Sequence, residues 1–253
     1  MKALIIANWK MNLSPTQAVG LALEIKKATK RETEKEVVLF PSFTALESVG
    51  KAIENSNLLL GAQNVFWEES GAFTGEESVK NLKELGCQYV IIGHSERRKY
   101  LGETNEMINK KISLALENEL IPILCIGETL EQRQEGRAEH TLWNQINEGL
   151  KGIDLVLSEK LAIAYEPVWA ISTSGTGQIM EPGDVQMAFN IIYQNLVDLW
   201  PLTIVSNNVR ILYGGSVDGA IAAELSKLSK ISGFLVGGAS LNSEEFTKII
   251  KNS

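Results

Sequence analysis

The sequence has few of the residues that build disulfide-bonded or metal-centred proteins. Among its 253 residues are two cysteines, Cys87 and Cys125, both in apolar surroundings and too few for a disulfide framework. Only two histidines exist, His94 and His140, and no predicted strand end brings them together. This argues against a His/Asp metal cluster, so we expect no metal site.

Long apolar runs and clusters of basic residues are also missing. No stretch is long enough to span a bilayer, and the apolar run at residues 3–7 is shorter than a signal-peptide core. The formal net charge of -7 argues against a nucleic-acid-binding face, because phosphate backbones are bound by clustered Lys and Arg. We therefore expect a cytoplasmic protein without nucleic-acid or membrane partners.

What is present is an ordinary globular composition, with 44% apolar and 22% charged residues. Short apolar runs alternate with longer amphipathic ones along the whole chain. The short runs predict strands at residues 4–7, 37–40, 58–60, 89–92, 121–126, 161–165, 209–212 and 233–236. Amphipathic patterns predict helices between them, such as residues 16–29, 104–117, 181–197 and 243–250.

This alternation predicts a single (β/α)8 barrel domain over residues 1–253, because no linker or composition break interrupts it. A doubly wound open sheet is the alternative. Its glycine-rich turn after the first strand is missing, since that strand runs directly into Asn8-Trp9-Lys10.

One strand of the predicted barrel ends on a carboxylate. The apolar run at residues 161–165 is followed by Glu166 and then by Pro167, which cannot continue a sheet ladder. Glu166 is therefore expected at the carboxyl end of the barrel, where barrel enzymes place their catalytic groups. A salt-bridged glutamate at a strand end is the alternative interpretation.

Other polar residues follow the predicted strands and are expected at the same mouth. They are Asn8 and Lys10, Gln63 and Asn64, His94 to Arg97, Cys125 and Glu128, Gly214 to Ser216, and Gly237 with Gly238. Each alone is weak evidence, since an isolated lysine or histidine is common. Together with Glu166, an imidazole and an ammonium near two glycine pairs predict acid–base chemistry on a phosphorylated small molecule.

The glycine pairs carry the phosphate hypothesis. Gly214-Gly215-Ser216 precedes a helix expected near Val217, and Gly237-Gly238 follows the last strand. Glycine lets the backbone approach an anion, and barrels commonly bind phosphate in the loops after strands seven and eight. Two purely structural turns remain the alternative.

These residues resemble the triosephosphate isomerase family. The similar stretches are Asn8-Trp9-Lys10-Met11-Asn12, Gly61-Ala62-Gln63-Asn64, Gly71-Ala72-Phe73-Thr74-Gly75-Glu76, Ile92-Gly93-His94-Ser95-Glu96-Arg97-Arg98, Cys125-Ile126-Gly127-Glu128, Ala164-Tyr165-Glu166-Pro167-Val168-Trp169-Ala170-Ile171, Tyr213-Gly214-Gly215-Ser216-Val217 and Leu235-Val236-Gly237-Gly238-Ala239-Ser240-Leu241. They run from residue 8 to 241 in family order, and they are specific as a set.

The resemblance implies interconversion of dihydroxyacetone phosphate and D-glyceraldehyde 3-phosphate in glycolysis and gluconeogenesis, without metal or organic cofactor. It implies that Glu166 is the base that moves a proton through an enediol(ate), and that His94 is a neutral electrophile. A helix opening at Ser95 would favour the neutral imidazole. Lys10 is implied to bind substrate charge and stabilise the enediolate, with Asn8 beside it.

The resemblance also implies the surroundings of these groups. Phosphate is expected on backbone N–H groups of Ser172, Ser216 and Gly238, with Gly237 in the same loop. Glu96 is expected behind the residues that touch substrate, and Cys125 beside the turn after the fourth strand.

A homodimer is a further expectation. The loop 64–76 carries Phe66, Trp67 and Phe73 in a polar setting, and exposed aromatic loops of this kind usually bind a partner. In the family such loops reach a neighbouring subunit, with Thr74 near that subunit's Lys10. A loop folded onto its own barrel is the alternative.

The chain departs from the family in the loop after Ile171. Family members usually have Gly-Thr-Gly-Lys-Thr-Ala there, and this chain has Ser172-Thr173-Ser174-Gly175-Thr176-Gly177. Gly175 and Gly177 add backbone freedom, so closing this lid is expected to cost about 1–2 kcal/mol more.

Two other functional classes remain. A metal-dependent aldolase or an indole-synthesising barrel would need a Schiff-base lysine or a His/Asp metal cluster. An inactive scaffold barrel would lack one of Lys10, His94 and Glu166, and all three are present.

Overall fold

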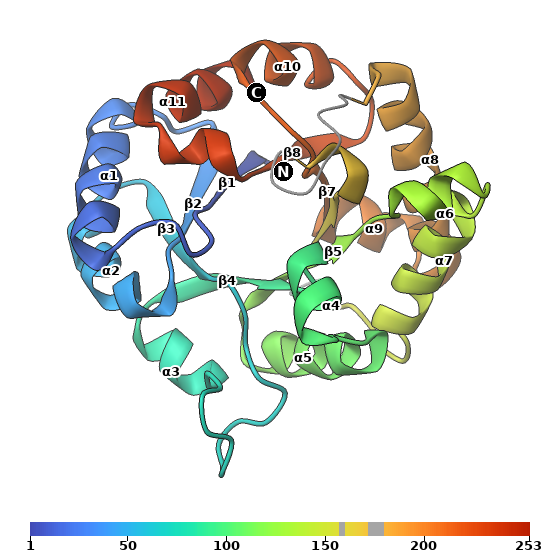
Figure 1. Ribbon diagram of the computed structural model, residues 1–253, viewed down its shortest axis with the longest axis horizontal. Coiled ribbons are helices and arrows are strands. Elements are labelled where there is room, and N and C mark those ends of the chain that lie inside the picture. The colour runs from blue at the N-terminus through green and yellow to red at the C-terminus, as the bar shows by residue number, and fades with distance from the viewer. Residues whose placement is uncertain (157–159, 172–179) are drawn as a thin grey trace.

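The computed structural model describes residues 1–156, 160–171 and 180–253, and these form a ring of parallel strands surrounded by helices (Figure 1). The strands are β1 (Ala3–Asn8), β2 (Lys35–Phe40), β3 (Leu58–Ala62), β4 (Cys87–Ile92), β5 (Ile121–Ile126), β6 (Leu161–Tyr165), β7 (Val209–Tyr213) and β8 (Ile231–Val236). Each pairs with the next, and β8 pairs with β1. The closed barrel confirms the predicted fold and excludes the open sheet.

Helices follow the strands and form the outer layer. They are α1 (Pro15–Ala28), α2 (Leu46–Ile53), α3 (Val79–Glu84), α4 (Ser95–Leu101), α5 (Asn105–Glu117), α6 (Leu130–Gln134), α7 (Ala138–Gly149), α8 (Pro182–Leu199), α9 (Leu202–Asn208), α10 (Gly219–Leu225) and α11 (Ser243–Asn252). Short 3-10 helices η1 (Phe43–Ala45), η2 (Val168–Ala170) and η3 (Gly238–Leu241) lie in the loops. None of the helices in these described ranges is long and apolar enough to cross a membrane.

The observed bounds differ little from the predicted ones. β5 and β6 have the predicted bounds, and the other strands extend one or two residues further. The helix expected near Val217 begins instead at Gly219, because Asp218 caps it. The Asp218 Oδ1 atom accepts hydrogen bonds from the amides of Ala220 at 2.9 Å and Ile221 at 2.8 Å.

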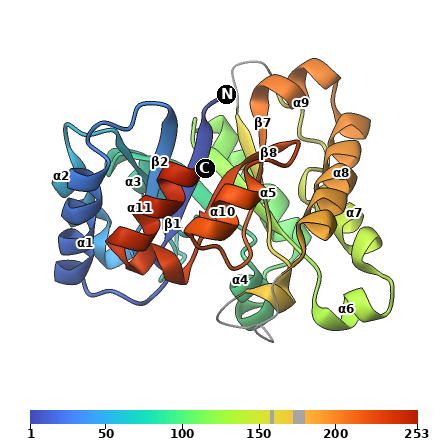
Figure 2. The same cartoon turned by 90° about the horizontal axis from the view of Figure 1, so that it is seen from above.

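The strands are mostly apolar because both of their faces are covered. In β1, Leu4 and Ile6 belong to the cluster inside the barrel, and Ile5 and Ala7 to the cluster between strands and helices. This alternation fills the barrel with side chains. In Figure 2 the N-terminus lies at the opposite end of the barrel from α4 and α6, which mark the carboxyl ends of the strands.

Candidate active site

A cavity of about 260 Å³ opens at the carboxyl ends of the strands. It brings together residues from the loops after β1, β4, β6, β7 and β8, and they include most of the predicted site. The lining residues are Asn8, Lys10, His94, Glu166, Ile171, Gly214, Gly215, Ser216, Val217, Leu235, Val236, Gly237, Gly238 and Ala239. The size of this cavity suits a small ligand.

Glu166 is held by the backbone of the neighbouring strands. Its amide donates to the Ile126 carbonyl at 2.7 Å, which extends the β5–β6 ladder by one residue. A Cβ at Gly127 would lie 1.7 Å from the Glu166 carbonyl oxygen, and one at Gly214 would lie 2.7 Å from Glu166 Cγ. Only glycine fits at these two positions: Gly127 leaves room for the main chain of Glu166, and Gly214 leaves room for its side chain.

The Glu166 carboxylate faces an imidazole and an amide. Its Oε1 atom lies 3.2 Å from His94 Nε2, and its Oε2 atom accepts from the Ser95 amide at 3.3 Å. Burial raises the pKa of Glu166, but His94, the Ser95 amide and Lys10 outweigh this effect. The pKa therefore lies below its ordinary value, and the carboxyl is ionised at neutral pH.

His94 caps α4, the short helix predicted after it. Its Nδ1 atom accepts from the Glu96 amide at 3.2 Å, so the ring proton of a neutral imidazole sits on Nε2 and points to Glu166. Burial lowers the pKa of His94, while contact with the Glu166 carboxylate raises it, and the net shift is upward. The upward shift thus depends on direct contact between the two groups.

Lys10 has a backbone conformation rare for a residue with a side chain, with φ at 52°. Two polar side chains fix it. Asn8 Oδ1 accepts from the Lys10 amide at 3.2 Å, and Gln63 Nε2 donates to the Lys10 and Phe40 carbonyls, both at 2.9 Å. Gln63 was expected at the mouth, and it holds Lys10 from behind.

The Lys10 ammonium is directed across the mouth. Its Nζ atom lies 2.6 Å from Glu96 Oε1, and a Cβ at Gly237 would lie 3.9 Å from that same nitrogen. Glu96 is not part of the cavity lining and pairs with the Lys10 cation. Lys10 also helps to lower the pKa of Glu166.

The two glycine loops form one wall of the cavity. The Ser216 amide donates to the Ala170 carbonyl at 3.2 Å, and the Ser216 hydroxyl donates to the same carbonyl at 2.8 Å. An anion can take up the Ser216 amide only by displacing that carbonyl. Gly237 and Gly238 lie at the start of η3, on the Lys10 side. Ser172 and the lid residues 172–177 lie outside the described residues.

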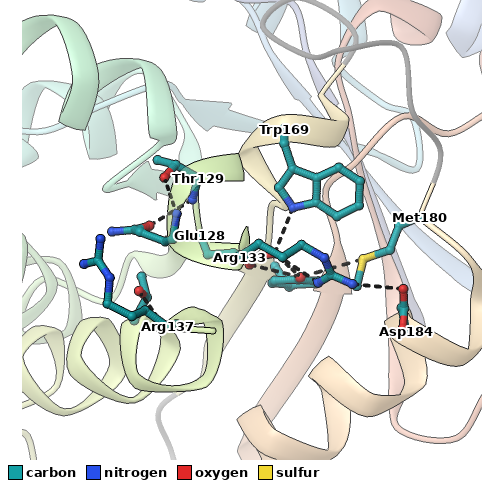
Figure 3. A network of polar contacts seen from close by, with 10 residues as sticks. Glu128, Thr129, Arg133, Arg137, Trp169, Met180 and Asp184 are labelled. Atoms are coloured by element: carbon teal, nitrogen blue, oxygen red, sulfur yellow. Dashed lines mark hydrogen bonds and ion pairs between the residues drawn. The ribbon is translucent and has the colours of Figure 1, made fainter. Parts of the chain in front are cut away.

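Two residues expected at the mouth turn away from the cavity. Asn64 is buried and accepts from Lys111 Nζ at 2.7 Å. Glu128 is fully buried and accepts from the Tyr165 hydroxyl at 3.1 Å and from Trp169 Nε1 at 2.9 Å (Figure 3). Polar residues after a strand therefore divide between cavity-facing and structural positions.

Arg133 extends the Glu128 network to α8. It lies 3.4 Å from Glu128 Oε1 and 2.9 Å from Asp184 Oδ2, with its guanidinium 4.9 Å from the centre of the Trp169 ring (Figure 3). The network thus connects the ends of β5 and β6 to the first turn of α8. Figure 3 also shows Met180 directed toward it, consistent with a 3.7 Å contact between its sulfur and the Tyr165 hydroxyl.

Cys125 is buried beside Glu166, and burial raises the pKa of its thiol well above the ordinary value. Its carbonyl accepts from Arg98 Nη2 at 3.2 Å, and the same Arg98 donates to the Gly93 carbonyl at 2.7 Å. Cys125 therefore neighbours the turn after β4.

Sequence reasoning missed the apolar part of the lining. Ile171, Val217, Leu235 and Ala239 contact the cavity. Apolar residues at strand ends look like core residues in a sequence. The sequence signal for Val217, Leu235 and Ala239 is their position within two residues of a glycine pair, whereas Ile171 ends the family-like stretch that carries Glu166.

The loop 64–76 projects from the barrel between β3 and α3 (Figure 1). Its aromatic residues largely pack on one another, with ring centres of Phe66 and Phe73 at 4.6 Å and of Phe66 and Trp67 at 4.1 Å. Phe66 is buried, contrary to the expected exposed aromatics, while Phe73 remains 42% exposed and Thr74 is exposed. In the described ranges no three His, Cys, Asp or Glu side chains gather as metal ligands.

Comparison with known proteins gives a consistent result. The family model described as triosephosphate isomerase matches residues 3–253. The chain is 45% identical over 251 residues to a triosephosphate isomerase of Dictyoglomus turgidum, covering 99% of both chains. It is 46% identical over 249 residues to those of Caldanaerobacter subterraneus subsp. tengcongensis and Clostridium botulinum, covering 98% of each chain in both cases.

Proposed function

The chain belongs to the triosephosphate isomerase family, and we propose that Glu166, His94 and Lys10 carry out the isomerase reaction in the cavity at the carboxyl end of the barrel. Its activity is the interconversion of dihydroxyacetone phosphate and D-glyceraldehyde 3-phosphate, which is the family's general role in glycolysis. The observation that supports the proposed roles is the convergence of these three side chains with both glycine loops on one cavity.

Glu166 is the proposed base. Its carboxylate removes a proton from the carbon next to the carbonyl of dihydroxyacetone phosphate, which leaves an enediolate. A hydroxyl proton then passes, by way of His94, from the oxygen of the first carbon to the former carbonyl oxygen. The protonated Glu166 gives its proton to the neighbouring carbon, which yields the aldehyde. Its lowered pKa keeps the carboxylate ionised before the first step, and its burial keeps bulk water from the transferred proton.

His94 is the proposed electrophile. Its Nε2–H donates to the substrate carbonyl oxygen and stabilises the negative charge that develops there. A substrate between His94 and Glu166 would separate the contact that contributes most to raising the pKa of His94. Glu96 would still raise this pKa, while burial, Lys10 and the start of α4 favour the neutral ring. Lys10 adds a full positive charge near the same oxygen, with Asn8 fixing its backbone.

The phosphate is proposed to bind the amides of Ser216 and Gly238, with Gly237 beside them. Binding exchanges the Ser216–Ala170 hydrogen bond for one to phosphate. The predicted third donor, the Ser172 amide, stays a prediction.

A coupled isomerase assay of the purified protein tests the function, with chelator present and absent. We expect the protein to turn over each triose phosphate, at a rate that is the same with and without chelator. In the same assay Lys10→Met should lower kcat/KM by roughly a hundredfold or more, since it removes a charge used in the transition state. Absence of isomerase activity in the folded wild type would contradict the function itself.

We also propose a homodimer formed through the loop 64–76. The support is its projection from the barrel, its exposed Thr74 and Phe73, and the nearly complete exposure of Met11 in the loop after β1. Such exposed apolar side chains are typical of interface residues. The partner loop would then order the surroundings of Lys10, so activity would require the dimer.

Phe73→Asp tests the dimer, because an unpaired carboxylate at the interface favours separate subunits. Sedimentation should show a shift toward monomer with a matching loss of kcat. Met187→Asp serves as the control, since Met187 is exposed on α8. An unchanged Phe73→Asp dimer, or a fully active monomer, would count against the proposal.

Two broader expectations complete the proposal. The chain is one folding domain, supported by the pairing of β1 with β8, and urea should unfold it in a single transition. Its location is the cytoplasm, where glycolysis takes place, so cell fractionation should recover the isomerase activity with cytoplasmic enzymes.

A further inference from the structure

The end of β5 has a strand neighbour on one side only. On the β6 side the ladder of hydrogen bonds continues past the ends of the strands. The Glu166 amide donates to the Ile126 carbonyl at 2.7 Å, and the Val168 amide donates to the Glu128 carbonyl at 3.0 Å. On the other side the pairing of β4 with β5 ends at Ile92 and Leu124. There the chain turns away into α4.

Two side chains supply the partners that β4 no longer provides. Arg98 donates to the Cys125 carbonyl at 3.2 Å. Gln145 on α7 pairs with Gly127 twice: its Oε1 accepts from the Gly127 amide at 2.7 Å, and its Nε2 donates to the Gly127 carbonyl at 3.1 Å. This reproduces the donor and acceptor that a neighbouring strand presents, and it satisfies a peptide that burial would otherwise leave unpaired.

The main chain of Gly127 packs directly against the main chain of Glu166, the residue that carries the proposed catalytic carboxylate. A Cβ at Gly127 would lie 1.7 Å from the carbonyl oxygen of Glu166 and 2.6 Å from its carbonyl carbon. The two main chains are therefore in direct contact, and a shift of Gly127 moves Glu166. No side chain lies between them to absorb such a shift.

The same hydrogen-bond network reaches the turn that carries His94. Arg98 donates to the Gly93 carbonyl at 2.7 Å and to Asn105 Oδ1 at 2.6 Å. Asn105 Nδ2 donates to Asn144 Oδ1 at 3.1 Å, and Asn144 precedes Gln145 on α7. One set of side chains thus fixes both the base and the electrophile to the same helix.

We propose that Gln145 is a positioning residue for proton transfer: its side-chain amide replaces the missing strand beside Gly127 and thereby sets the distance between Glu166 and the reacting carbon. This inference rests on the proposed role of Glu166. Because misplacing a reacting group by about 1 Å costs roughly a hundredfold in rate, loss of the pairing should act on kcat. Gln145 is not one of the residues that line the cavity with the loops after β7 and β8, so KM should change little.

Two variants test the inference. Gln145→Met keeps the length of the side chain and removes both hydrogen bonds, and Gln145→Glu keeps the acceptor for the Gly127 amide but cannot donate to its carbonyl. Gln186 provides a matched control, because it pairs with Ser229 in the same way. Its Oε1 accepts from the Ser229 amide at 3.0 Å, and its Nε2 donates to the Ser229 carbonyl at 3.3 Å. Ser229 precedes β8 and lies at the amino end of the barrel.

The measurements are kcat, KM and the primary isotope effect with substrate deuterated at the carbon that loses its proton. For Gln145→Met we expect kcat to fall about tenfold to a hundredfold, KM to stay within about threefold, and the isotope effect on kcat to rise. Gln145→Glu should lose less, and Gln186→Met should stay within about twofold of the wild type.

The inference is overturned if folded Gln145→Met keeps kcat within about twofold of the wild type, or if Gln186→Met loses as much. A rise in KM alone, with no change of isotope effect, also overturns it, and so does an equal loss in both Gln145 variants. Glu166→Gln is measured alongside. If that variant kept the wild-type rate, the assignment of the base would fail first, which separates the two failures.

Discussion

The two ends of the barrel both hold buried charges, but they use them differently. Near the amino ends of the strands, the Glu36 carboxylate accepts from Arg210 and, at 3.0 Å, from the Tyr89 hydroxyl. These three side chains point into the barrel from β2, β7 and β4. At the carboxyl end, Glu166 meets His94 and the Ser95 amide at the longer distances of 3.2 and 3.3 Å, beside an open cavity.

The difference shows how one fold separates stability from function. In the amino-end cluster the charged groups neutralise one another, as expected of groups that only stabilise. At the carboxyl end the polar groups face a cavity, Lys10 has a strained backbone, and the Ser216 amide is held by a carbonyl that a ligand can displace. Strain and loosely satisfied polar groups thus collect at the end of the barrel where we propose that substrate binds.

At the amino end, Arg210→Met should cause the largest loss in the free energy of unfolding. It removes the cation that pairs with Glu36 and leaves a carboxylate inside the barrel without its counter-charge. Because the Glu36 side chain is 27% exposed, we expect a loss of about 3 kcal/mol in the free energy of unfolding, at the lower end for a broken buried pair. Urea unfolding measures it, and kcat of the folded variant should stay close to that of the wild type.

Lys51→Met is the control for this variant, since the Lys51–Glu47 pair is exposed on α2 and should contribute almost nothing. The double variant Glu36→Gln, Arg210→Met should recover part of the stability lost in Arg210→Met. A normal free energy of unfolding in Arg210→Met, or a loss of kcat without destabilisation, would remove the distinction between the two ends.

Gly214→Ala should have the opposite effect, lowering kcat and leaving stability nearly unchanged. Its added methyl would lie 2.7 Å from Glu166 Cγ, so the carboxylate must move while the barrel below it stays intact. We expect kcat to fall by roughly tenfold or more, with little change in melting temperature. Gly20→Ala in α1 is the matched control, because nothing lies within 4 Å of the added atom and kcat should not change.

A smaller effect is expected in the pH dependence of stability. Burial raises the pKa of Glu36, but Arg210 and Tyr89 outweigh it, and the net pKa lies below its ordinary value of 4.5. A carboxyl with a lowered folded pKa stabilises the protein above its unfolded pKa, and this stability is lost as the pH falls through the folded value. Between about pH 5 and 3 the wild type should therefore lose more stability than Arg210→Met. Equal acid slopes in urea unfolding would contradict this.

The fold was largely predictable because apolar runs and their spacing carry it. Residues 121–126 and 161–165 read as strands and are strands, and Glu166 follows the second one as expected. The placement of Lys10, His94 and Glu166 at one mouth followed from strand ends alone, since all parallel strands of a barrel end on the same side.

The sequence could not indicate which polar side chains turn inward from a loop or strand. Arg210 lies within a run that reads as a plain buried strand, and its partner Glu36 is 174 residues away. Glu128 and Asn64 follow strands as His94 does, but their side chains do not face the cavity. Glu128 accepts a hydrogen bond from Trp169, and Asn64 accepts one from Lys111. Such choices depend on long-range partners, which no local pattern encodes.

The proton itself gives the most direct test of the account. In deuterium oxide the wild type should place deuterium on the carbon of dihydroxyacetone phosphate that loses its proton, as nuclear magnetic resonance will show. In Glu166→Gln this exchange should slow by about 10²–10⁴-fold, while the affinity for inorganic phosphate and the free energy of unfolding stay close to those of the wild type. Exchange within about tenfold of the wild type would show that Glu166 is not the base and would contradict the assignment of chemistry to this end of the barrel.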